Sequence, residues 1–158
     1  MTRRPLLALL CTLGLAAKTG RAQTTAAPKI EPLRLADAEW KKRLAPAAYD
    51  VLRHEGTERP GSSPLNDEHR KGVFHCAGCE LALFASDTKF DSGTGWPSFF
   101  TSLPGAVVTK TDFKLIVPRS EYHCARCEGH QGHVFDDGPR PTGKRYCNNG
   151  VALKFVPA

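Results

Sequence analysis

Four of the six cysteines form two matched C-x-x-C pairs, Cys76 with Cys79 and Cys124 with Cys127. Each pair presents two thiolates from one tight turn, and two such turns complete a tetrahedral zinc site. A four-thiolate site has no open coordination position, so we expect the zinc to be structural. Two alternatives use the same residues: a pair of disulfides, which a secreted location would favour, or a thioredoxin-like redox pair.

Cys147 is the thiol that this arrangement leaves over, because the sixth cysteine, Cys11, lies in the N-terminal segment. Residues two apart in a strand share a face, so Arg145, Cys147 and Asn149 would line up together. A guanidinium beside a thiol favours the thiolate, which is the reactive form. These neighbours favour a nucleophile over the alternative, a buried and inert cysteine.

Two histidines and a tryptophan complete the set of residues that could do chemistry. His130 and His133 follow the second C-x-x-C pair, and together they suit proton delivery near neutral pH. Their alternatives are structural or surface roles, or replacement of a cysteine as zinc ligands. Trp96 precedes Pro97 and is therefore held extended, and its indole offers a flat apolar wall with one donor. A tryptophan of the core is the alternative there.

Short elements must position these groups. We predict one helix over Ala38–Leu44, capped by Asp37, and a second that opens at Pro46 and stops at Gly56. From Gly72 onward the sequence turns β-prone and is punctuated by Gly, Pro and Asp. The fold class is therefore mainly β, a small antiparallel sheet protein with helices at one end. The predicted strands are Val73–Cys76, Leu81–Ala85, Ala106–Thr111, Phe113–Val117, Gly132–Phe135 and Arg145–Phe155.

The first 22 residues resemble an export signal. Arg3 and Arg4 precede the uncharged run Pro5–Ala17, which is shorter than the roughly 20 apolar residues that span a bilayer. Gly20-Arg21-Ala22 provides a small-x-small cleavage site. The paired arginines also fit a twin-arginine signal, which serves bacterial export to the periplasm. We expect an exported protein, by that route or by ordinary secretion.

The remaining chain divides into a flexible lead-in, residues 23–35, and one domain, residues 36–158. The net charge of +6 is misleading, because four of the 22 basic residues lie in the first 22 positions, where there is no acid. The rest of the chain carries 18 basic and 16 acidic residues, a net charge of +2. Nothing in it indicates a nucleic-acid surface or a membrane segment beyond export.

Two stretches, HCAGCELALFASDTKFDSGTGWPSFF (75–100) and YHCARCEGHQGHVFDDGPRPTGKRYCNNGVALKF (122–155), closely resemble the type B methionine sulfoxide reductases. The resemblance extends over roughly residues 36–156. It implies two small antiparallel sheets forming an open barrel, N-terminal helices and, in many members, structural zinc. It also implies reduction of the R epimer of methionine sulfoxide, usually in proteins.

The resemblance assigns roles by matching positions. Cys147 would be the catalytic nucleophile and His133 the proton donor. Five further residues would line the site or bind the substrate: His130, Asn149, Arg145, Trp96 and Phe99. Arg145 would support the thiolate, and Trp96 would pack against the substrate methyl group.

One position departs from the family pattern. Many members carry a resolving cysteine before the Gly-Trp-Pro motif, where this chain has Thr94. The sulfenic acid left on Cys147 would then be reduced directly by an outside thiol, from a thioredoxin-like protein or another reductant. The other partners would be oxidised proteins or peptides, and we expect a monomer. The competing functions are a zinc-ribbon-like binding module without catalysis and a secreted, disulfide-stabilised protein.

Overall fold

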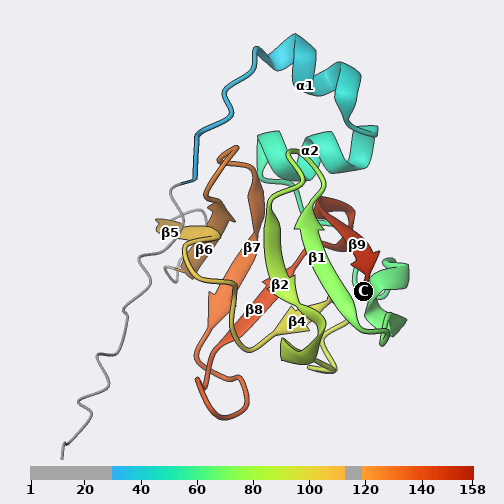
Figure 1. The fold of residues 1–158 in the computed structure, drawn as a ribbon, viewed down its shortest axis with the longest axis vertical. Helices are drawn as coiled ribbons and strands as arrows, with labels where there is room; N and C mark the ends of the chain where they lie inside the picture. The colour runs from blue at the N-terminus through green and yellow to red at the C-terminus, as the bar shows by residue number, and fades with distance from the viewer. Residues whose placement is uncertain (1–29, 113–118) are drawn as a thin grey trace, which may run out of the picture.

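Two short helices lie together at one end of the molecule (Figure 1). The computed structural model describes residues 30–112 and 119–158, with α1 at Asp37–Arg43 and α2 at Pro46–His54. Both predicted helices are confirmed to within a residue or two. Asp37 begins α1 instead of capping it, and its carboxylate accepts a hydrogen bond of 2.6 Å from the Tyr49 hydroxyl. Glu55 caps the C-terminal end of α2 and takes the left-handed conformation at a φ of 57°.

The strands form two antiparallel sheets, one with the order β2-β1-β9 and one with the order β3-β4-β8-β7-β6-β5. The predicted fold class is thereby confirmed, and the described strands do not close into a barrel. The strands are β1 (Gly72–Cys76), β2 (Ala82–Ala85), β3 (Lys89–Phe90), β4 (Ser98–Phe99), β5 (Val107–Asp112), β6 (Arg119–Cys124), β7 (His130–Phe135), β8 (Arg145–Asn148) and β9 (Leu153–Pro157). The described residues also form three 3-10 turns: η1 (Pro64–Asp67) before β1, η2 (Ser86–Thr88) between β2 and β3, and η3 (Gly150–Ala152) between β8 and β9.

The segment predicted as one strand, Arg145–Phe155, is two strands in different sheets. β8 pairs with β4 and β7, and β9 pairs with β1. The turn η3 separates them, because the carboxylate of Glu58 accepts hydrogen bonds from the amides of Gly150 and Val151 at 2.6 and 3.0 Å. The predicted strand over residues 113–117 lies outside the described residues.

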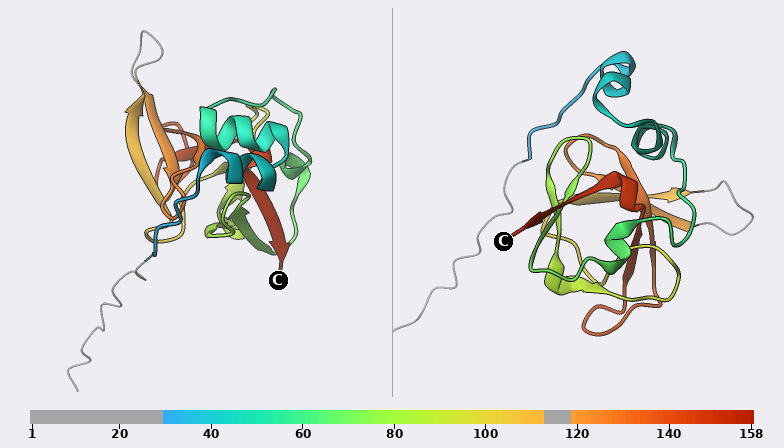
Figure 2. Two further views of the ribbon diagram at one scale, coloured as in Figure 1. Left: turned by 90° about the horizontal axis from the view of Figure 1, so that it is seen from above. Right: turned by 90° about the vertical axis from the view of Figure 1, so that its right-hand side faces the viewer.

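The core fills the space between the sheets and beneath the helices, which lie over the sheets when seen from above (Figure 2). Phe84 and Phe99 stack with ring centroids 4.2 Å apart, and Phe74 meets Phe99 edge-on at 4.9 Å. Trp40 brings α1 into the same core and is 2% exposed. Burial of these large rings holds together two sheets that share no strand.

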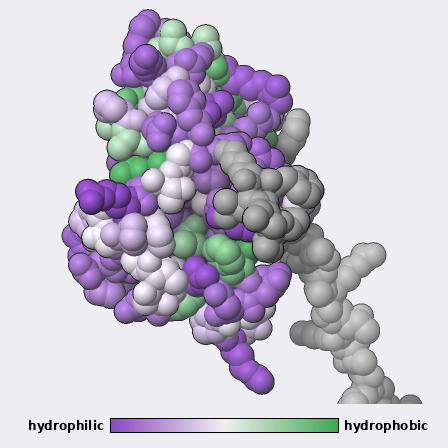
Figure 3. Space-filling view, turned by 180° about the vertical axis from the view of Figure 1, so that it is seen from behind, coloured by the Kyte–Doolittle hydropathy of each residue, from purple (hydrophilic) through white to green (hydrophobic). Residues whose placement is uncertain are grey.

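The face seen from behind is mainly hydrophilic, with hydrophobic side chains in small areas (Figure 3). Among the described residues, Val108 and Val156 are the large hydrophobic side chains that are exposed. No described helix is long and apolar enough to cross a membrane.

Candidate active site and metal centre

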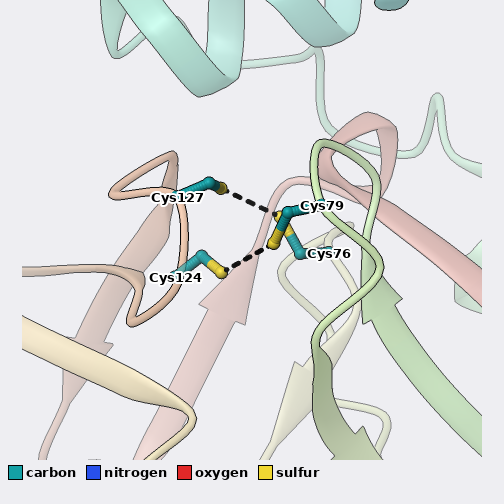
Figure 4. A group of neighbouring side chains, drawn as sticks. All are labelled: Cys76, Cys79, Cys124 and Cys127. Carbon is teal, nitrogen blue, oxygen red and sulfur yellow. Dashed lines mark hydrogen bonds between the residues drawn. The ribbon is translucent and has the colours of Figure 1, made fainter. Parts of the chain in front are cut away.

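The four paired cysteines meet in one buried cluster. Cys76 ends β1 and Cys124 ends β6, and Cys79 and Cys127 lie in the turns that follow. Their sulfurs point toward one another from two separate loops (Figure 4). Cys76 Sγ lies 3.6 Å from Cys127 Sγ, and Cys79 Sγ lies 3.4 Å from Cys124 Sγ. The sequence therefore predicted correctly that the two pairs come together.

The two C-x-x-C turns have the same backbone conformation. Glu80 and Glu128 follow them in the left-handed conformation, at φ values of 61° and 59°. Each of these residues donates its amide to the carbonyl of the first cysteine of its pair, at 2.8 and 2.9 Å. This turn aims both thiols of a pair to the same side, as a shared ion requires.

The spacing of the cluster suits a metal ion better than disulfides. Tetrahedral zinc with Zn–S bonds of about 2.3 Å separates its sulfurs by roughly 3.8 Å, whereas a disulfide bond is about 2.05 Å long. The two observed distances, 3.4 and 3.6 Å, lie near the first value. Both close contacts also join different pairs, so neither C-x-x-C pair is closed on itself. These four residues could hold a metal ion.

Cys147 lies in β8 between two other strands, with Ser98 of β4 opposite it on one side and His133 of β7 on the other. Its side chain lines a cavity of about 160 Å³. Four residues that the sequence singled out share this cavity: Trp96, His133, Cys147 and Asn149. The other lining residues are Thr57, Arg119, Gly132, Phe135 and Asn148.

His133 is held by a carboxylate that the sequence did not single out. The Asp112 side chain is buried, and its Oδ2 lies 2.9 Å from His133 Nε2. Arg119 Nη2 donates to the same oxygen at 2.7 Å. A carboxylate hydrogen-bonded to an imidazole nitrogen fixes the orientation of the ring. Only the strand register brings Asp112 to this place, so no local pattern in the sequence could have revealed it.

The environment of Cys147 differs from the predicted one. Burial raises the pKa of the Cys147 thiol above its usual value, and this effect outweighs the lowering by the Arg145 charge and by hydrogen bonds from Thr94 and Arg145. Arg145 does lie beside the thiol, as predicted, but Asp137 binds its guanidinium at 2.8 Å through two nitrogens. Before substrate binds, Cys147 is therefore a neutral thiol at neutral pH and not a standing thiolate.

Three predicted site residues do not line the cavity: Arg145, which lies beside the thiol, Phe99 and His130. Phe99 is completely buried and stacks in the core, which places it away from any substrate. His130 is 1% exposed and lies behind His133, with the two ring centroids 5.5 Å apart. Burial lowers the pKa of His130 to about 4, so this imidazole is neutral at neutral pH. The placement of the lone Phe99 depends on side-chain packing, which the sequence pattern did not predict.

Asn149 and Trp96 line the cavity while holding the connector before η1. Asn149 Oδ1 accepts a hydrogen bond from the Glu58 amide at 3.0 Å, and its Nδ2 donates to the Gln131 carbonyl at 3.0 Å. Trp96 Nε1 donates to the Glu58 carbonyl at 3.2 Å. With its only donor engaged, the indole presents an apolar wall.

Known proteins are similar in sequence to this chain over most of its length. The SelR domain family matches residues 44–157. The chain is 51% identical to the peptide methionine sulfoxide reductase MsrB of Agrobacterium fabrum, over 77% of this chain and 90% of that one. The identity is 54% to the enzyme of the same name from Methanosarcina barkeri, over 75% and 84% of the two chains.

A chloroplast relative is longer. The chain is 52% identical to peptide methionine sulfoxide reductase B1 of Arabidopsis thaliana over 82% of its own length, but this stretch is 64% of that protein. Among solved structures, the Mis18 "Yippee-like" domain aligns with a TM-score of 0.44 and 18% identity, over 56% of this chain and 98% of that one. That similarity is too low to support a shared function. On the match to its domain family and on these identities, the chain belongs to the SelR family, the type B methionine sulfoxide reductases.

Proposed function

We propose that this enzyme reduces the R epimer of methionine sulfoxide, mainly in peptides and proteins, with Cys147 as the nucleophile. The observation that supports this most is one cavity lined by the Cys147 thiol, the His133 imidazole and the Trp96 indole. It offers a nucleophile, an acid and an apolar wall within one small space. Membership in the family supports the same reaction.

In the proposed step, Cys147 Sγ attacks the sulfoxide sulfur and forms an S–S bond to it. The protonated sulfoxide oxygen then passes to Cys147 Sγ, as that S–S bond and the S–O bond of the substrate break. The products are methionine and the sulfenic acid of Cys147, so the substrate is reduced and the thiol oxidised by two electrons. The sulfoxide oxygen must gain a proton as it leaves its sulfur. His133 takes this proton from the Cys147 thiol and passes it on to the sulfoxide oxygen.

The raised pKa of Cys147 has a consequence for this step. The thiolate must form after the substrate enters, when His133 takes up the thiol proton, with Arg145 and Thr94 stabilising the charge. Asp112 acts as a positioning residue because it holds the His133 ring at Nε2.

The proposed selection between epimers depends on where the oxygen and the methyl group of the substrate lie in the cavity. A sulfoxide sulfur carries an oxygen, a methyl group and the longer side chain, and the two epimers exchange the positions of the first two. In this proposal the R preference is taken from the family: the R epimer would be the one whose methyl group lies against Trp96 when its oxygen faces His133. The S epimer would place its methyl group elsewhere, without that contact.

We further propose that the four-cysteine cluster binds structural zinc. Its donor set, its burial and its sulfur spacing fit that ion, which would hold β1 and β6 together at the junction of the two sheets. The metal lies outside the reaction, because Cys147 is not among the four ligands.

The reductant in this proposal is an outside thiol. Two thiols convert the sulfenic acid to the free thiol, giving one disulfide and one water. Thr94 hydrogen-bonds Cys147 at the place of the resolving cysteine of other members, so this chain offers a hydroxyl where an internal disulfide would form. The candidates are a thioredoxin-like protein or another thiol carrier.

Export to the periplasm is proposed from residues 1–22, which lie outside the described residues. Export of the full chain should leave a product that begins near residue 23. Exchange of Arg3 and Arg4 for lysine should block export if the twin-arginine route is used. Unchanged export of that variant would leave ordinary secretion as the route.

Peptides that carry separated R and S sulfoxides, with dithiothreitol as the reductant, test the central proposal. We expect turnover of the R peptide only, and none by Cys147→Ser with unchanged zinc content. Reduction of the S peptide at a similar rate would refute the epimer assignment. Failure to reduce either peptide would favour a zinc-dependent binding module without catalysis.

A further inference from the structure

A second group of potential metal ligands lies apart from the four cysteines. It consists of the Glu121 carboxylate on β6, His123 on the same strand and His130 on β7, and all three are buried. One donor atom from each residue lies within 4.8 Å of the other two. A buried carboxylate with two imidazoles is a common donor set for divalent transition metals.

The donor spacing agrees with a shared ion. Glu121 Oε1 lies 3.3 Å from His123 Nε2, and Glu121 Oε2 lies 3.1 Å from His130 Nδ1. Tetrahedral zinc with bonds of about 2.0–2.1 Å would separate its donors by roughly 3.3–3.4 Å. The same comparison supports the four-cysteine cluster, where the sulfur spacing is wider because Zn–S bonds are longer.

Hydrogen bonding leaves these histidine nitrogens without partners. Among the described residues, His123 Nε2 and both ring nitrogens of His130 are buried and make no hydrogen bond of acceptable geometry. His123 Nε2 and His130 Nδ1 lie 3.3 and 3.1 Å from the Glu121 oxygens, so poor alignment and not distance prevents hydrogen bonds there. Donors around one ion point at the ion and not at each other, which accounts for short distances with poor alignment.

One hydrogen bond sets the tautomer of His123. Its Nδ1 lies 3.0 Å from the Glu128 carbonyl, an acceptor, so this nitrogen carries the proton. The Nε2 atom of this tautomer then has a lone pair available to a metal ion. A backbone carbonyl on the far nitrogen is the usual outer partner of a metal-binding histidine.

The site can be reached from solvent. His123 lines a cavity of about 400 Å³ together with Glu55 and Lys110. Lys110 Nζ lies 2.9 Å from Glu121 Oε1 and also 2.9 Å from Glu55 Oε1. The Lys110 side chain is 53% exposed, so it can leave Glu121 while keeping Glu55. Its ammonium group competes with any cation for the Glu121 carboxylate.

We propose that Glu121, His123 and His130 form a second metal site, for a divalent transition ion such as Zn²⁺. The ion would have three protein ligands and a fourth, open position on the cavity side. It would also fix His130, whose ring lies edge-on to His133 at 5.5 Å. The proposed ligand His130 thus contacts His133, which lines the cavity of Cys147.

Titration of the zinc-loaded protein with Co²⁺ tests this site, because cobalt bound by nitrogen and oxygen lacks the thiolate-to-metal charge-transfer bands of a cysteine site. We expect one additional equivalent of cobalt, without those bands and without release of zinc. Glu121→Gln should weaken that binding by at least about 100-fold, since even outer partners of a metal ligand are worth about 10–100-fold. Lys110→Met should strengthen it, because the competing ammonium group is removed.

His75 offers a matched control. It also precedes a C-x-x-C pair, and its Nδ1 contacts the carbonyl five residues on, that of Glu80, at 2.8 Å. It belongs to neither group of potential ligands. His75→Ala should therefore leave cobalt binding unchanged, whereas His123→Ala should abolish it. Three results would each overturn the proposal: no additional equivalent, binding that displaces zinc from the cysteines, or equal affinities in the wild type and Lys110→Met.

Discussion

Replacement of Gly132 by alanine should disable the enzyme without unfolding it. Gly132 lies on β7, next to His133 and opposite Asn148. An alanine Cβ there would lie 1.9 Å from the Cys147 carbonyl oxygen. The atoms nearest to this Cβ are backbone atoms of β8, which cannot turn away as a flexible side chain can.

The size of the effect follows from that contact. An ordinary contact needs at least 3.4 Å, so β7 and β8 must separate locally by about 1.5 Å. A misplacement of about 1 Å at a reacting group can cost 100-fold in rate, or about 2.7 kcal/mol. We therefore expect kcat/KM for an R-sulfoxide peptide to fall by at least about 100-fold. Overpacking of this kind should lower the free energy of unfolding by about 1–3 kcal/mol.

Gly72→Ala provides the comparison. Its Cβ would lie 2.3 Å from the carbonyl oxygen of Val156, so it produces a similar collision in the other sheet, between β1 and β9. Both variants should lose stability in thermal unfolding, but only Gly132→Ala should lose activity per folded molecule. A folded Gly132→Ala protein with kcat/KM within about threefold of the wild type would refute the proposed coupling of β7 to Cys147.

Four other predictions follow from the site. Because burial raises the pKa of Cys147, the rate of its alkylation by iodoacetamide should rise with pH, with a midpoint above that of an ordinary thiol. Arg145→Met should move this midpoint higher still, and a midpoint below that of a free cysteine would contradict the expectation. Asp112→Asn should lower kcat more than it changes KM, with normal zinc content, because it releases the His133 ring; unchanged kcat would remove its positioning role. Thr94→Cys should yield an intramolecular disulfide with Cys147 after one turnover, seen by mass spectrometry as the loss of two hydrogens, and a lasting sulfenic acid would speak against the proximity of the two side chains. Removal of zinc by a chelator should abolish cooperative unfolding. Binding of structural zinc contributes about 10–16 kcal/mol, whereas the free energy of unfolding of a typical domain is about 5–15 kcal/mol. A cooperative unfolding transition in the metal-free protein would argue against a structural role.

The elements that sequence reasoning found depend on local patterns. Pro46 begins a helix because its ring fits the first helical position. The C-x-x-C spacing is enough by itself to predict a turn that presents two thiols to a metal ion. The two-residue strands β3 and β4 were missed, because they are too short to show any alternation. β6 was missed because its sequence, RSEYHC, is polar, although its last four residues are buried.

In the candidate site, too, residues that are close in sequence could be predicted and contacts between distant strands could not. The chain segment around Cys147 could be predicted, because Arg145 and Asn149 are its neighbours in sequence. Asp112 could not, since its contact with His133 arises from the register of three strands. The protonation of Cys147 was predicted wrongly, because a neighbouring charge is visible in a sequence while the burial that outweighs it is not.

Chemical trapping of Cys147 after a single turnover tests the proposed mechanism most directly. The zinc-loaded enzyme is mixed with one equivalent of R-sulfoxide peptide, without reductant and with a sulfenic-acid trap, and the adduct is located by mass spectrometry. The mechanism predicts one methionine formed per adduct, with the adduct on Cys147 and none with the S-sulfoxide peptide. Methionine formed without an adduct, or an adduct on one of the four clustered cysteines, would contradict it.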